Sequence, residues 1–188
     1  EEYFIAENED NQLSHVYKNM GTVNLRQGKM NDAKTFYEKQ LDLCYRYNLK
    51  RQSSEALGNL GIIHIILGEF SDAIKHFQKV LDVNIEIGDQ QARAKTFGNL
   101  GLSHKELKEF ETALAYFNKM LDLAGKIGDQ HTVANAYSSI GLVYKHQGSY
   151  SKSISFFKKK HGYYGKAEND SWTYEYPCKY GGNICRYG

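Results

Sequence analysis

Two histidines stand at equivalent places in this sequence and come nearest to a site for metal chemistry. His64 and His104 are 40 residues apart, and Asn24 and Tyr144 occupy the same place one interval before and after them. Imidazole nitrogens bind zinc and related ions where several ligands converge. No cysteine or carboxylate joins the two histidines at a spacing typical of metal ligands, and the asparagine and tyrosine favour a packing role. We therefore predict structural histidines, with no metal and no cofactor.

Motifs for catalysis are absent from the sequence. It contains no HExxH, GxSxG or GxxxxGK[ST] motif, so it predicts no enzyme. The 24 Lys and Arg residues face 22 Asp and Glu residues, and this net charge of +2 predicts no nucleic-acid partner. The longest apolar run, at 62–67, is far shorter than a membrane span and predicts no membrane insertion. Three cysteines without a CxxC pair favour a reducing compartment, and we predict a cytoplasmic protein.

A row of amides offers a different chemistry, which is recognition of a peptide. Asn19, Asn59 and Asn99 recur every 40 residues, with Ser139 in the fourth place. An asparagine side chain both donates and accepts hydrogen bonds, so a row of them can pair with a peptide backbone. The alternative is that these amides only satisfy groups of neighbouring helices. Apolar residues also recur beside the row, as specificity pockets or as core: Ile62, Leu102 and Leu142.

The elements that position these residues follow the same interval. Glycines, small residues and aromatics each recur in phase, in the series Gly21, Gly61, Gly101, Gly141 and Gly181; Ala33, Ala73, Ala113 and Ser153; and Tyr37, Phe77, Phe117 and Phe157. Apolar residues three and four apart predict two helices per unit, for example over 91–107 and 110–127. Gly88 and Gly128 are placed to end helices, and Asp89 and Asp129 to cap the next ones. We expect the Gly21 series to allow close approach to Ala33, Ala73 and Ala113.

The repeat phase divides the chain into six segments. We expect residues 1–10 to be the end of a preceding repeat's second helix, so that the sequence is a segment of a longer array. Four units follow, at 11–50, 51–90, 91–130 and 131–160, the last extending to about 170. Residues 161–188, rich in Tyr and Gly, are predicted to form a degenerate first helix of a fifth unit. Pro177 falls inside that helix and is expected to kink, shorten or remodel it.

The stretch ALGNLGIIHIILGEFSDAIKHFQKVLDV resembles a tetratricopeptide repeat. The 40-residue interval and the recurring NLG and IGDQ resemble the long-helix form of the Pins/LGN adaptor group. This resemblance implies an all-α fold, a right-handed superhelix or α-solenoid of antiparallel helix pairs, with four full repeats and partial repeats at both ends. The first helices would line a concave groove, and the asparagine row would hold a peptide there.

The resemblance implies a non-catalytic scaffold or adaptor that binds a peptide or helix of a partner protein in this groove. Chaperone-binding repeats hold a terminal carboxylate with two lysines, two asparagines and an arginine. Lys18, Asn59 and Lys95 match three of these places, whereas Thr22 and Asn99 depart from the pattern. The alternative function is that of an architectural subunit that docks through its outer surface in a multi-protein complex, such as a ciliary or axonemal assembly associated with the cytoskeleton.

Overall fold

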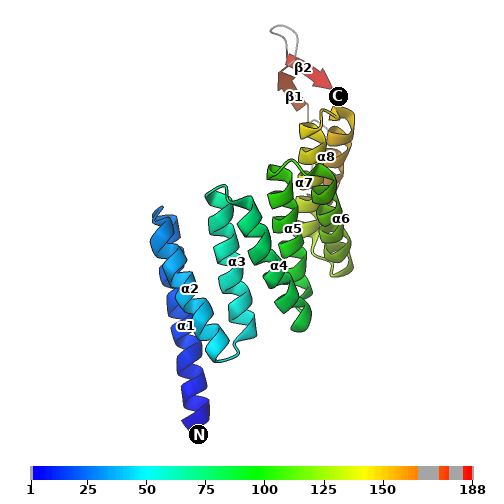
Figure 1. Ribbon diagram of the computed structural model, residues 1–188. Helices are drawn as coiled ribbons and strands as arrows, with labels where there is room; N and C mark the ends of the chain where they lie inside the picture. The colour runs from blue at the N-terminus through cyan, green and yellow to red at the C-terminus, as the bar shows by residue number, and fades with distance from the viewer. Residues whose placement is uncertain (1, 165–173, 178–183, 188) are drawn as a thin grey trace.

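In the part of the chain that the structure describes, eight helices in antiparallel pairs form a solenoid (Figure 1). The computed structural model describes the backbone at 2–164, 174–177 and 184–187, and the side chains of residues 10–162. The helices are α1 (Glu2–Arg26), α2 (Met30–Arg46), α3 (Lys50–Ile66), α4 (Phe70–Glu86), α5 (Gln90–Glu106), α6 (Phe110–Lys126), α7 (Gln130–His146) and α8 (Tyr150–Tyr164). Each helix packs against the next one along the chain. The predicted all-α solenoid is confirmed for residues 2–164.

Every turn between two helices is built in the same way. From α2 onward a helix begins every 20 residues, and the three residues before it form the turn. The middle residue of each turn has a positive φ, with Gly28, Gly68, Gly88, Gly128 and Gly148 joined by Asn48 and Lys108. Glycine adopts this conformation without steric cost, which ends each helix and reverses the chain. Asp89 and Asp129 accept hydrogen bonds from the backbone N–H of Ala92 and Thr132, so both predicted caps are confirmed.

The core lies between repeats as much as within them. One cluster joins Ala33 and Tyr37 of α2 to Leu60 and Ile63 of α3, and another joins α6 to α7. These interfaces link the second helix of one repeat to the first helix of the next. Each repeat buries its apolar face only against its neighbours, so contacts between adjacent repeats stabilise the whole solenoid.

The glycines inside the first helices make room for aromatic rings of the second helices, whereas the prediction named the alanines as their partners. A Cβ atom built on Gly21 would lie 2.6 Å from the ring of Tyr37, and one on Gly61 would lie 2.8 Å from the ring of Phe77. Only a residue without a Cβ lets these rings reach the helix backbone. The glycine series is therefore matched to the aromatic series.

The N-terminal helix differs from the prediction that residues 1–10 belong to a separate helix. In the structure α1 is continuous from Glu2 to Arg26 and has no turn at Asn8, the counterpart of Asn48. An asparagine costs a helix interior less than about 1 kcal/mol, whereas a break would leave backbone groups unpaired. Asn8 therefore does not end the helix, and α1 continues through it.

The C-terminal segment contains strands where a helix was predicted. Strand β1 (Tyr174–Pro177) pairs antiparallel with β2 (Ile184–Tyr187), with Tyr174 opposite Tyr187 and Pro177 opposite Ile184. The prediction of a helix is wrong for these residues, because proline disfavours a helix interior while tyrosine and isoleucine favour strands. Residues 161–164 of the predicted segment belong to α8, and residues 165–173, 178–183 and 188 lie outside the described residues.

Candidate functional site

The predicted asparagine row lies on the solvent-accessible surface of the first helices. Asn19 on α1 is exposed, and Asn59 on α3, Asn99 on α5 and Ser139 on α7 are partly exposed. None of these three amides makes a side-chain hydrogen bond within the described residues. The Asn99 backbone carbonyl accepts from the Ser103 hydroxyl, but its amide takes no part.

Two pairs of first helices contact each other directly in the described part of the chain. Helix α5 packs directly against α7, as well as against its chain neighbours. Two side-chain contacts join α1 to α3: the Gln52 amide donates to Asn11 Oδ1 at 2.6 Å, and Lys18 Nζ lies 2.9 Å from Glu55 Oε2. In a curved stack of helix pairs, the helices that approach most closely lie on the inner side.

Apolar side chains accompany the amides one helical turn further on. Ile62 and Leu142 are each 38% exposed, and Leu102 is partly buried. Ile62 and Leu102 each follow an asparagine of the row by three residues, which places them on the same helix face. None of the three belongs to a core cluster of the described chain.

The lysines predicted near the row have different surroundings. Lys18 is half-buried and paired with Glu55, and Lys95 is exposed. The Thr22 hydroxyl donates to the Lys18 carbonyl and contacts the Tyr37 hydroxyl at 3.1 Å. The carboxylate of Glu55 therefore partly neutralises one of the two lysines that a carboxylate-binding clamp would need.

His64 and His104 each contact an acid of their own instead of forming a shared pair. His64 Nδ1 lies 2.6 Å from Glu69 Oε2 and His104 Nδ1 lies 2.5 Å from Glu109 Oε2. We predicted that no carboxylate joins these histidines at a spacing typical of metal ligands, whereas in the structure a glutamate contacts each ring. In the sequence each glutamate stands five residues after its histidine. The three-residue turn between the two helices brings the carboxylate of this glutamate onto the imidazole ring.

A second histidine packs on the first of these rings. The His76 ring on α4 stacks on His64, with 5.0 Å between ring centroids. Burial, followed by the nearby His64, lowers the pKa of His76 below its usual value. The Lys75 ammonium, 2.8 Å from Asp72, lowers the pKa of that carboxyl group. At neutral pH the His76 imidazole is therefore neutral and Asp72 is an ionised carboxylate.

The family model of the tetratricopeptide repeat matches residues 12–86 and 90–159. The chain belongs to the tetratricopeptide repeat family. The match begins in α1, ends in α8 and leaves out the two strands. Comparison with curated protein sequences finds no match. Within the part that the structure describes, no helix combines the length and apolar character needed to cross a membrane.

Solved structures with the same fold include bacterial repeat proteins of low sequence identity. BtubC (BKLC) from P. vanneervenii has a TM-score of 0.75 at 18% identity, over 92% of this chain and 72% of that one. Aspartyl phosphate phosphatase F from Bacillus subtilis has a TM-score of 0.75 at 16% identity, over 80% of this chain and 39% of that one. The Rap conjugation gene regulator of plasmid pLS20, solved with the Phr* peptide, has a TM-score of 0.70 at 16% identity, over 79% of this chain and 42% of that one. This chain therefore spans less than half the length of two of these three proteins.

Proposed function

We propose that this tetratricopeptide repeat chain is a non-catalytic adaptor that binds a peptide or helix of a partner protein along its first helices. The observation that carries the proposal is the row formed by Asn19, Asn59 and Asn99, whose amides have no hydrogen-bond partner among the described residues. Amides at a fixed interval on successive helices can hold the backbone of a ligand whatever its side chains are. Ile62, Leu102 and Leu142 would then supply the selectivity between ligands.

Two further observations support this function. The Rap regulator, whose fold this chain shares, was solved with a bound peptide. The 40-residue interval resembles that of the Pins/LGN group, whose members are adaptors. The clamp for a terminal carboxylate is the less favoured mode of binding, because Lys18 is already paired with Glu55.

The test is selection of binding peptides from a random library, followed by titration of one selected peptide. The triple variant Asn19→Ala, Asn59→Ala, Asn99→Ala removes the row, and the control Asn31→Ala, Asn118→Ala removes exposed asparagines from second helices. A hydrogen bond to a backbone contributes about 0.5–1.5 kcal/mol, so the triple variant should lose at least about tenfold in affinity. Equal affinity of the triple variant and the control would overturn the groove mechanism.

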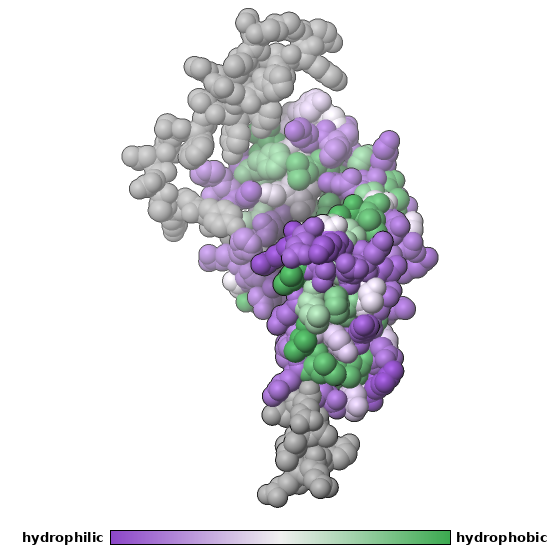
Figure 2. Space-filling model, turned by 90° about the vertical axis from the view of Figure 1, so that its left-hand side faces the viewer, coloured by the Kyte–Doolittle hydropathy of each residue, from purple (hydrophilic) through white to green (hydrophobic). Residues whose placement is uncertain are grey.

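A second candidate function, that of an architectural subunit, is favoured by an apolar stripe on α1. The stripe consists of Leu13, Val16, Met20 and Val23, which are between 40% and 53% exposed. Their counterparts on α3, which are Ser53, Ala56, Leu60 and Ile63, are at most 3% exposed under α2. Figure 2 views the molecule from the α1 end and shows apolar side chains gathered there. The stripe would fit an amphipathic helix that carries a small residue and then an aromatic residue four positions later, as α2 does.

The double variant Val16→Lys, Met20→Lys separates the two functions. Association with a partner that depends on the stripe should be lost in this variant and retained in the asparagine triple variant. The opposite pattern would favour the adaptor function. Circular dichroism of both variants checks that the helices are retained.

A further inference from the structure

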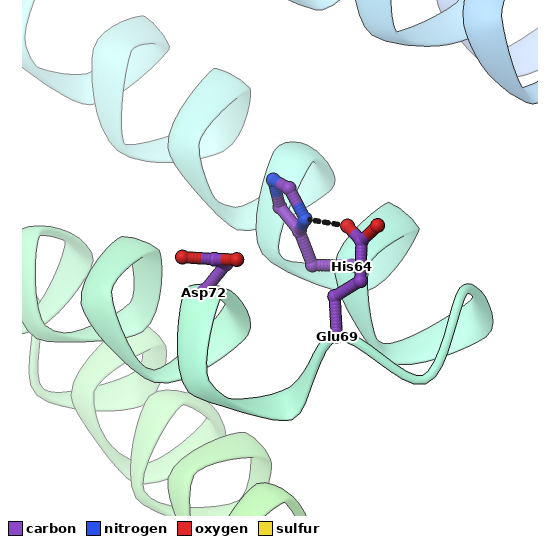
Figure 3. A group of neighbouring side chains, drawn as sticks. All are labelled: His64, Glu69 and Asp72. Carbon is purple, nitrogen blue, oxygen red and sulfur yellow. Dashed lines mark hydrogen bonds and ion pairs between the residues drawn. The ribbon is translucent and has the colours of Figure 1, made fainter.

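The turn between α3 and α4 brings metal-binding side chains together from three successive elements. His64 lies in the last turn of α3, Glu69 in the loop, and Asp72 in the first turn of α4 (Figure 3). One possible ligand atom from each of the three lies within 4.8 Å of the others. Figure 3 shows the hydrogen bond from the His64 ring to Glu69 and the Asp72 carboxylate alongside.

Burial fixes one of these ligands and leaves the other two adjustable. The His64 side chain is only 8% exposed, whereas those of Glu69 and Asp72 are each 50% exposed. Ligands of a tetrahedral zinc ion lie about 3.4 Å apart, given bonds of roughly 2.0–2.2 Å. Rotation of the two exposed carboxylates is enough to close the distance around a fixed imidazole.

His76 adds a fourth donor, one turn after Asp72 on α4. Its ring stacks on His64 at an interplanar angle of 17°. Its Nδ1 atom is buried and has no hydrogen-bond partner in the described part of the chain. A buried ring nitrogen without a partner costs stability, and a metal ligand bond would satisfy it after a rotation of the ring.

We propose that His64, Glu69, Asp72 and His76 bind one divalent transition-metal ion, with Zn²⁺ as the ion that best fits this ligand set. Two imidazoles suit Zn²⁺, Cu²⁺ or Ni²⁺, whereas Mg²⁺ and Ca²⁺ prefer sites made of oxygen ligands alone. The ion would replace the ammonium of Lys75, which lies 2.8 Å from Asp72 and is 73% exposed. It would tie the end of α3 to the start of α4 and so stiffen one repeat of the adaptor.

The next repeat provides an internal control. His104 and Glu109 reproduce the first histidine and its acid, but Thr112 stands in the place of Asp72 and Tyr116 in the place of His76. The Tyr116 ring stacks on His104, with 5.3 Å between centroids, as His76 does on His64. The two turns therefore have the same shape and differ by two ligands.

The experiment titrates Zn²⁺ into the chelator-treated chain by isothermal titration calorimetry. The variant Asp72→Thr, His76→Tyr gives the first turn the residues of the second. The variant Thr112→Asp, Tyr116→His gives the second turn the residues of the first. We expect one site in the unmodified chain, at least about a tenfold weaker affinity in the first variant, and two sites in the second variant. Mg²⁺ at the same concentration should give no binding.

Two further measurements keep the test decisive. Glu69→Gln should weaken Zn²⁺ binding by at least about tenfold, because it replaces a charged carboxylate ligand with a neutral amide. NMR signals of the His64 and His76 rings should shift on addition of Zn²⁺, while those of His104 should not. Equal Zn²⁺ affinity in the unmodified chain and in Asp72→Thr, His76→Tyr, with helicity retained, would overturn the proposal.

Discussion

Replacement of Gly61 by alanine tests whether the glycine series exists to admit aromatic rings. A Cβ atom at Gly61 would lie 2.8 Å from two ring atoms of Phe77, and ordinary contact begins at 3.4 Å. The ring must therefore move by about 0.6 Å, the difference between these distances. Phe77 is fully buried against Ala73, Leu81 and Leu100, so the movement compresses a packed core. Overpacking of this kind costs about 1–3 kcal/mol.

Gly58→Ala in the same helix is the matched control. A Cβ atom there meets nothing within 4 Å, so this variant gains helix propensity without a clash. Because both variants gain the same propensity, the difference between them isolates the packing cost. We expect Gly61→Ala to be less stable than Gly58→Ala by about 1–3 kcal/mol, which corresponds to roughly 2–12 °C in Tm.

The assay is thermal and urea unfolding of both variants, followed by circular dichroism. Adding Phe77→Leu to each variant should reduce the difference between them, because the smaller side chain leaves room for the new methyl group. If Gly61→Ala is as stable as Gly58→Ala, the ring does not require the glycine, and the explanation of the series is wrong.

Three further predictions follow from the turns and from the surface of the repeats. Asp129→Ala should lower the free energy of unfolding by about 1 kcal/mol at pH 7, because it removes a helix cap. Hydrogen bonds from the Thr132 side chain and backbone lower the pKa of Asp129, so this loss should be complete above the usual aspartate pKa and should disappear as the pH falls through the lowered pKa. Urea unfolding at several pH values measures it. Lys108→Gly should raise stability by about 0.5–1 kcal/mol, because Lys108 has a φ of 63°; thermal unfolding measures this, and no gain would contradict a backbone origin. A double-mutant cycle on Lys18 and Glu55 should give a coupling of about 0.2–1 kcal/mol that falls with added salt, whereas a coupling independent of salt would contradict a surface ion pair.

Much of the fold could be predicted because the signals that set it are local. A residue with a positive φ follows each helix from α1 to α7, and all of these residues except Lys108 are glycine or asparagine. Asp89 and Asp129 cap the helices that follow them, and the bounds of α5 and α6 agree with the prediction to within about one residue. The asparagine row could likewise be found from its interval alone. Its role in binding stays a prediction, because recognition depends on a ligand that the chain does not contain.

The sequence by itself determined the repeat, the helix pairs and the turns, since each depends on residues close together along the chain. Only the tertiary structure decided which groups meet across the turns and between the helices. It set Gly61 against a phenylalanine ring instead of an alanine, and it folded Glu69 and Asp72 onto His64. It also gave strands at 174–177 and 184–187 in place of a helix. Such contacts depend on the angle between helices and on competing ways to pair the backbone, which a repeat interval does not encode.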